Sequence, residues 1–179
     1  MQGRFNATSI MGRLTYTRWA YRNDFAGKER VLRKLRSDIQ TAVFADRDAL
    51  FNVMESLGGS LRDQNRLGEY EEIARDYVIA ARGRPESNKA KNHLAVGLTM
   101  MAKAQHMQEK YDAAEISLRE AVNLFLARPA DLNLTWGIHT MSVLEIWLRG
   151  WSRTSDADKL KEEINILVER DSKGKEDVY

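Results

Sequence analysis

Apolar residues recur at every third or fourth position through most of this chain, which is the spacing of one buried helix face. The stretch 26–44 is a clear example, because Leu32, Leu35 and Ile39 fall on one stripe. No stretch alternates apolar and polar residues for long between turn residues, so strands are not expected. The pattern predicts an all-α chain with eight helices, near residues 9–22, 26–44, 47–65, 69–83, 88–107, 111–127, 132–151 and 156–169.

Four residues mark where these helices end or weaken. Pro85 and Pro129 are the only prolines, and each follows the end of a predicted helix, because the residue before a proline avoids helical geometry. Gly58 and Gly59 fall inside the third helix and are expected to shorten or kink it. The segment 171–179 is charged and poor in apolar residues, so we expect a flexible tail there.

The eight predicted helices pair into hairpins with a regular repeat. An aromatic residue follows the break inside each of the first three pairs, at Phe25, Tyr70 and Tyr111, and Thr154 takes its place in the fourth. The spacings of 45, 41 and 43 residues indicate stacked helical hairpins, because one hairpin cannot bury its apolar faces alone. The sequence therefore predicts an α-solenoid of about four hairpins, near 9–44, 47–84, 88–128 and 132–169, in a single domain over residues 1–170.

The segment 101–121 resembles the tetratricopeptide repeat family. That family has a large–small pair, then a turn with an aromatic residue, then alanines three and ten residues further on, and Tyr111, Ala114 and Ala121 match this spacing. In the preceding hairpin, the family's turn glycine, aromatic, second alanine and closing proline correspond to Gly68, Tyr70, Ala80 and Pro85.

The chain also departs from the family pattern. Ile73 stands where the first small residue belongs, and Glu109 replaces the turn glycine beside Tyr111. The period near 42 residues is similar to the long-helix variety found in kinesin light chains. A generic helical bundle with accidental spacing is the alternative interpretation.

Composition narrows the class of protein. Of 179 residues, 43% are hydrophobic and 30% are charged, which is ordinary for a folded domain. The chain has no cysteine, so it has no disulfides and no cysteine-ligated metal. No run of about 18 apolar residues could cross a membrane, and residues 1–13 are too polar for a secretory signal. We therefore expect an intracellular, cytoplasmic protein with no membrane contact.

Nothing in the sequence has the pattern of a catalytic or metal site. His106 and Glu109 are three residues apart and could share a metal on a helix, but no second such pair is visible. Gly58-Gly59 lacks the lysine and the strand-to-helix context of a phosphate loop, and no nucleophilic serine motif occurs. The prediction is a protein that is not an enzyme and that uses no cofactor and no metal.

The resemblance implies a concave groove lined by the first helix of each hairpin. Two hairpins would contribute its lining, namely Arg62, Asn65, Arg66, Thr99, Lys103 and His106. This set is basic, so an acidic or carboxylate-bearing peptide is the expected ligand. The groove lacks the asparagines of the family's carboxylate-clamp members, and ordinary solvated helix charge is the alternative.

Two tryptophans form a second candidate surface. Trp147 and Trp151 are four residues apart on one helix face. They could be a binding hot spot or a patch for homo-oligomerisation. They could also cap the last hairpin, and the cap is the preferred interpretation.

Charge is uneven along the chain, although the total is only +2. Residues 1–45 carry a net +6, and residues 46–86, 87–130 and 131–179 carry −3, +2 and −3. The basic run consists of Lys28, Arg30, Arg33, Lys34 and Arg36. Its helix also has a full apolar stripe, so a solvated outer face is preferred over a nucleic-acid site.

These features together predict a scaffold or adaptor, a tetratricopeptide-like module that presents a concave groove to a peptide or protein partner. The alternative is a helical regulator that binds nucleic acid through the N-terminal basic helix. The sequence does not identify the partner or the oligomeric state.

Overall fold

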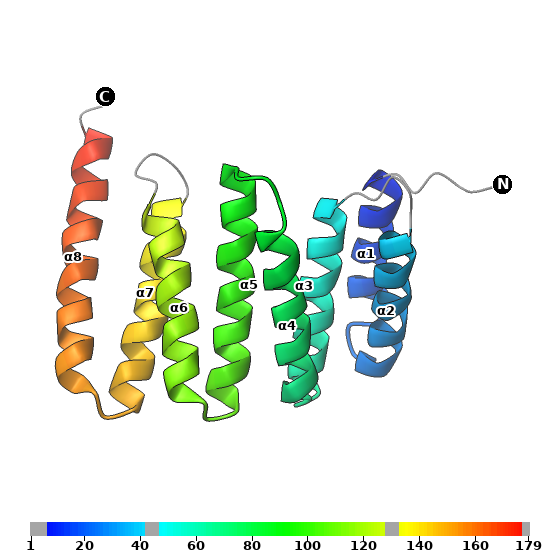
Figure 1. The fold of residues 1–179 in the computed structure, drawn as a ribbon, viewed down its shortest axis with the longest axis horizontal. Coiled ribbons are helices and arrows are strands. Elements are labelled where there is room, and N and C mark those ends of the chain that lie inside the picture. Colours follow the sequence, from blue (N-terminus) through cyan, green and yellow to red (C-terminus); the bar gives the residue numbers. More distant parts are fainter. Residues whose placement is uncertain (1–6, 42–46, 128–132, 177–179) are drawn as a thin grey trace.

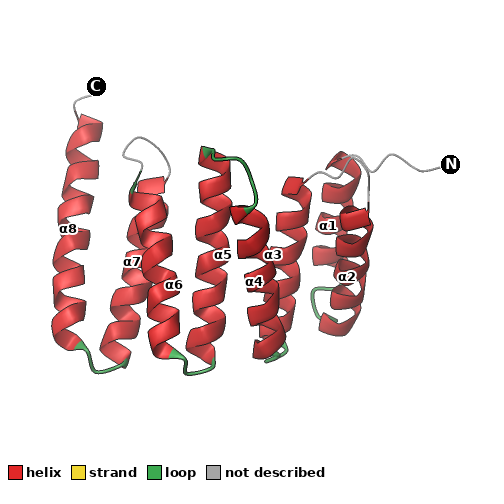
Figure 2. Ribbon diagram, in the orientation of Figure 1, coloured by secondary structure: helices red, strands yellow, loops and turns green. Residues whose placement is uncertain are grey.

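The computed structural model describes residues 7–41, 47–127 and 133–176, and in these ranges the chain is all α-helical (Figures 1 and 2). Eight helices follow one another in the described ranges. Their bounds are α1 (Ala7–Ala20), α2 (Phe25–Thr41), α3 (Arg47–Asp63), α4 (Leu67–Arg82), α5 (Asn88–Met107), α6 (Tyr111–Leu126), α7 (Asn133–Gly150) and α8 (Thr154–Glu176).

The helices form four hairpins, α1–α2, α3–α4, α5–α6 and α7–α8, which stand side by side in chain order (Figure 1). Each helix packs mainly against the helix before it and the helix after it, and α3 also contacts α1 and α5. This arrangement confirms the predicted α-solenoid. It follows from short connections between amphipathic helices, because each hairpin covers the apolar face of its neighbour.

The apolar core runs along the stack and contains the predicted stripes. Leu32, Leu35 and Ile39 of α2 are fully buried, as are Leu57 and Leu61 of α3. One cluster of buried side chains extends from α1 to α5, and a second joins α5 and α6 to α7 and α8. Burial of side chains of this size contributes about 1.5–3 kcal/mol each, so the stripes stabilise both the helices and their stacking.

The second, third and fourth hairpins share one turn geometry. Asn65, Glu109 and Ser152 have positive φ angles of 56°, 61° and 62°. The backbone N–H after each of them donates to a carbonyl five residues earlier, for example from Lys110 to Gln105 at 2.9 Å. This is the Schellman ending of a helix. The turn residues are 44 and 43 residues apart, so the repeat is a property of the backbone and not only of the sequence.

The turns correct the predicted register of the aromatic residues. Tyr111 is the first residue of α6 and corresponds to Phe25, Leu67 and Thr154, which begin α2, α4 and α8. Tyr70 lies one turn further into its helix and corresponds to Ala114. The backbone N–H of Tyr70 donates to the backbone carbonyl of Arg66, and that of Ala114 donates in the same way to the carbonyl of Lys110. Accordingly Tyr70 is 3% exposed whereas Tyr111 is 40% exposed, so the two tyrosines have unrelated environments.

Glycines make room for the large side chains of α4. A Cβ on Gly58 would lie 3.0 Å from the Tyr70 ring, and one on Gly97 would lie 2.7 Å from the Tyr77 ring. In the third hairpin the residues that correspond to Tyr70 and Tyr77 are Ala114 and Ala121, both fully buried. The prediction that Gly58-Gly59 shortens the third helix is wrong, because α3 continues through both residues to Asp63.

A repeated ion pair connects successive hairpins. Glu29, Glu71 and Glu115 lie on the second helices, and each pairs with a base four residues later, which is Arg33, Arg75 or Arg119. Each glutamate also pairs with the base that precedes the second helix of the next hairpin. These partners are Arg66, Lys110 and Arg153. The side chains of the three glutamates are only 10–13% exposed, so the network is partly shielded from water.

The C-terminal end of the stack is polar. In α6 the residues buried against the next hairpin include Leu118 and Val122. The corresponding residues of α8 are exposed and polar, and they are Lys161 and Asn165. A polar outer face is typical of a capping repeat. The helix also continues to Glu176, beyond its predicted end near 169, so residues 171–176 are helical and 177–179 lie outside the described residues.

Replacing Gly97 by alanine should destabilise the protein, by about 1–3 kcal/mol, because the new methyl group meets the Tyr77 ring and the backbone of Val78. Urea unfolding measures the change in the free energy of unfolding. Gly59→Ala is the matched control, because a Cβ there meets nothing within 4 Å. The control should be neutral or more stable by up to about 1 kcal/mol through helix propensity. Equal effects of the two substitutions would refute the packing explanation.

Replacing Glu71 by glutamine should destabilise the protein by about 1 kcal/mol, because Lys110, Arg75 and Gln108 lose a charged acceptor. Glu72→Gln is the control, since Glu72 is exposed and adjacent in the chain. Urea unfolding of both variants measures the loss of stability. A loss in Glu72→Gln as large as that in Glu71→Gln would contradict a stabilising role for the ion pairs of Glu71.

Candidate functional site

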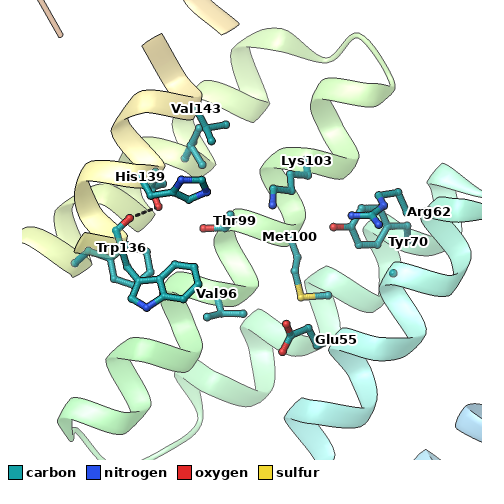
Figure 3. A pocket seen from close by; sticks show the side chains of 14 residues that line it. Glu55, Arg62, Tyr70, Val96, Thr99, Met100, Lys103, Trp136, His139 and Val143 are labelled. Carbon is teal, nitrogen blue, oxygen red and sulfur yellow. Dashed lines mark hydrogen bonds between the residues drawn. The ribbon is translucent and has the colours of Figure 1, made fainter. Parts of the chain in front are cut away.

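A cleft of about 350 Å³ opens on the side of the stack formed by α3, α5 and α7. Its walls carry Glu55 and Arg62 from α3 and Trp136, His139 and Val143 from α7, which face one another across α5 (Figure 3). The residues between the walls are Gly59, Tyr70, Val96, Thr99, Met100, Lys103, Leu118, Phe125 and Thr140. The cleft is therefore a composite of three hairpins, and no single hairpin contains it.

Lys103 is the cation at the centre of the cleft. Its side chain comes from α5 and lies between Arg62 on one side and His139 on the other (Figure 3). Burial lowers the pKa of the Lys103 amine from its usual 10.5, and the charge of Arg62 lowers it further. Within the described ranges no hydrogen bond or ion pair involves this amine. A partly desolvated cation without a partner is a favourable position for an anionic group of a ligand.

Other charged and polar groups of the cleft are engaged within the protein. Arg62 pairs with its neighbour Asp63 at 2.8 Å, although both side chains are substantially exposed. The hydroxyl of Thr99 donates to the carbonyl of Ala95 at 2.9 Å, and that of Thr140 donates to the carbonyl of Trp136 at 2.7 Å. These threonine hydroxyls already use their only proton. The amine of Lys103 remains as the cationic donor of the cleft with no partner among the described residues.

Trp136 gives the cleft an exposed aromatic wall. It is 58% exposed, and its ring meets that of His139 edge-on at a centroid distance of 6.3 Å. Other lining residues of the cleft are apolar, and they include Met100, Leu118 and Phe125. Burial raises the pKa of the Tyr70 hydroxyl to about 12, so this residue is a neutral phenol in the cleft. The site thus combines apolar lining residues with the amine of Lys103 at its centre.

Three of the six predicted groove residues line the cleft, namely Arg62, Thr99 and Lys103. The other three do not, and each has a structural role instead. Asn65 is the residue of positive φ in the turn between α3 and α4. Arg66 pairs with Glu29 and Glu69 at the junction of two hairpins. The ring of His106 stacks on Trp147 at 4.1 Å with an interplanar angle of 3°.

Trp147 and Trp151 pack against the preceding hairpin. Their rings meet His106 and Tyr111, with Trp151 and Tyr111 at a centroid distance of 5.1 Å. Both tryptophans are half-buried, and these ring contacts connect the last hairpin to the third. The exposed tryptophans are Trp19 on α1, at 70%, and Trp136, at 58%.

The basic run of α2 is partly used for hairpin stacking. Arg33 pairs with Glu69 at 2.7 Å, and Arg36 pairs with Asp76 at 2.7 Å, so both connect α2 to α4. Arg30 and Lys34 are exposed on the outer surface. This pairing neutralises two of the five bases on which the nucleic-acid interpretation depends.

A separate polar network lies between the second and third hairpins. The hydroxyl of Tyr77 and Nδ1 of His93 are 3.1 Å apart, and Nε2 of His93 lies 3.4 Å from Asp48. Burial opposes the charge of Asp48, but Lys89 and Arg84 outweigh it and lower its pKa to about 2. Burial lowers the pKa of His93. This network connects elements of the core and lies outside the cleft.

The sequence interpretation missed Glu55 and the α7 wall. The signal that could have found the wall is the repeat register, because Val96 and Met100 of α5 correspond to His139 and Val143 of α7. The predicted spacing of 43 residues between Tyr111 and Thr154 already contained that register. Among the residues that the structure describes, no three acidic or histidine side chains gather as a metal site, and no described helix is long and apolar enough to span a membrane.

The protein should lose stability as the pH falls below 6.5, because burial lowers the pKa of both His93 and His106. In that range the unfolded chain binds more protons than the folded chain, so acidification favours unfolding. The pKa values of Glu29, Glu71 and Glu115 are also lowered, so these residues reduce the stability only as the pH falls below their usual pKa of 4.5. Urea unfolding between pH 7.5 and 5 tests this, and His93→Gln should show a weaker dependence on pH. An unchanged slope in the variant would count against a role for His93.

Comparison with known proteins assigns no family to the chain, because no protein-family model matches it and no curated protein matches it.

Proposed function

We propose that this protein is an interaction module, a scaffold or adaptor, that holds a segment of a peptide or protein partner in the cleft between α3 and α7. One observation carries the proposal: the first helices of three hairpins together form an open cleft with an exposed tryptophan and an amine that has no partner among the described residues. Exposed aromatic residues and cations at a concave surface are the usual anchors of protein recognition.

A tetratricopeptide-like architecture supports this function. Ala102, Ala114 and Ala121 are fully buried in the third hairpin, where the family has its small residues. In the second hairpin, Tyr70 and Tyr77 occupy the places of the last two alanines, and Gly58 and Gly97 provide the space. We therefore propose a relative of this family in which Gly58 and Tyr70 of the second hairpin take the places of Ala102 and Ala114 of the third.

The arrangement of the stack also suits binding of an extended partner. Buried cores and ion pairs join the three hairpins that carry the cleft, and the cleft is present without a ligand. A preformed site lowers the entropy lost on association. Because the walls belong to different hairpins, a ligand that contacts both walls also contacts α5 between them.

Selection from a random peptide library displayed on phage tests the proposal. The intact protein should enrich peptides that bind it, and the double variant Lys103→Met, Trp136→Ala should bind them at least about tenfold more weakly, the loss expected for removing hot-spot contacts. The control is Lys34→Met, Trp19→Ala, which removes an exposed lysine and an exposed tryptophan from the first hairpin.

Circular dichroism and thermal unfolding should show both double variants folded. Enrichment of no peptide, or of peptides that the control variant loses and the cleft variant keeps, would contradict the proposal.

A further inference from the structure

We infer that the cleft selects a peptide segment in which an acidic side chain is next to a large apolar side chain, with the carboxylate at Lys103 and the apolar group beside Trp136. This inference rests on the proposed function, because it names the partner chemistry of the same cleft. It is argued from the cation at Lys103, from the apolar lining residues and from their place in one cleft.

The cation selects an anion over a neutral polar group. Lys103 has no hydrogen-bond or ion-pair partner in the described ranges, whereas Lys89, Lys91 and Lys110 are each ion-paired. Arg62 acts on Lys103 through its charge, so the two cations lie near one another. An incoming carboxylate would relieve this repulsion and would give the half-buried amine a partner.

The acidic residue of the lining does not neutralise this site. Glu55 is close enough for its charge to act on Lys103, yet the structure has no ion pair between them. The lining residues thus include two basic side chains, Arg62 and Lys103, and one carboxylate. Because Arg62 is paired with Asp63, Lys103 is the basic group of the lining that favours a ligand of one negative charge.

The cavity selects an apolar side chain. Its volume of about 350 Å³ is at the lower end of the range for small-ligand sites, which suits one large side chain. Val96, Met100 and Phe125 are apolar lining residues, and Trp136 provides a broad ring that water otherwise covers. An aromatic or long aliphatic side chain placed there would bury this surface.

The arrangement of the walls favours an internal acidic residue over a free C-terminus. Lys103 lies between the α3 wall and the α7 wall, so a carboxylate that reaches it has lining residues of the cleft on both sides (Figure 3). Trp136 and Lys103 are on different helices, so adjacent residues of the ligand would contact different hairpins. The group that binds Lys103 is therefore an Asp or Glu side chain, and the neighbouring residue of the ligand is Phe, Leu or a similar residue.

Blocked dipeptides test this inference on the intact protein by NMR. The probes are N-acetyl-Glu-Phe-amide, its Gln-Phe counterpart, which lacks only the charge, and its Glu-Ala counterpart, which lacks only the ring. The readout is the indole N–H signal of Trp136, assigned with Trp136→Phe, and the indole signal of Trp19 is the internal control. Glu-Phe should shift the Trp136 signal and leave Trp19 unchanged, with an affinity at least about threefold higher than that of either counterpart.

Lys103→Met should remove the preference for Glu-Phe over Gln-Phe while Gln-Phe binding persists, and Lys103→Gln provides the same test with a polar side chain. Equal affinities for Glu-Phe and Gln-Phe in the intact protein, or a preference that survives in both Lys103 variants, would overturn the assignment of the carboxylate. Equal affinities for Glu-Phe and Glu-Ala would overturn the assignment of the apolar group.

A further probe, N-acetyl-Ala-Phe with a free C-terminal carboxylate, separates the two sources of the anion. Tighter binding of this probe than of Glu-Phe would overturn the choice of an internal acidic residue. Peptides from the phage selection that need the cleft but lack an acidic–apolar pair would refute this inference and leave the proposed function standing.

Discussion

A helical hairpin of this chain cannot cover its own apolar faces, and the rest of the structure depends on that constraint. Leu57 and Leu61 of α3 are buried in a cluster that contains side chains of three hairpins, from α1 to α5. Stacking in chain order satisfies every hairpin with the shortest connections. It leaves the first helices on one side of the stack, and the cleft between α3 and α7 is a consequence of that order.

Stacking by apolar contact alone does not define how far one hairpin is shifted along the next. The repeated ion pairs supply a directional contact at the same place in each junction. Burial opposes the charge of Glu71, but hydrogen bonds from Lys110 and Gln108 and the charges of Lys110 and Arg75 outweigh it and lower its pKa. The glutamates are thus ionised, and each binds one base on its own helix and one base in the turn of the next hairpin. These contacts align each second helix with the following turn.

The same network separates the structural charges from those available to a ligand. Arg66, Lys110 and Arg153 are basic side chains like Lys103, but each forms an ion pair with a glutamate of the preceding hairpin. Lys103 lies on a first helix, away from these junctions. The two ends of the stack also differ, since α8 has a polar outer face whereas α1 exposes Trp19 and Tyr16.

The sequence by itself determined the helices, their pairing and the all-α class, because apolar periodicity and turn residues act over a few neighbouring positions. Three of the six residues that it predicted to line a groove, Arg62, Thr99 and Lys103, line the cleft. The tertiary structure decided the register of the repeat, which places Tyr70 with Ala114 and not with Tyr111. It also decided which cations are paired and brought the α7 wall to the cleft. Those features depend on contacts between residues about 40 positions apart, whose geometry is set by turns of positive φ at Asn65, Glu109 and Ser152 that have no glycine to reveal them.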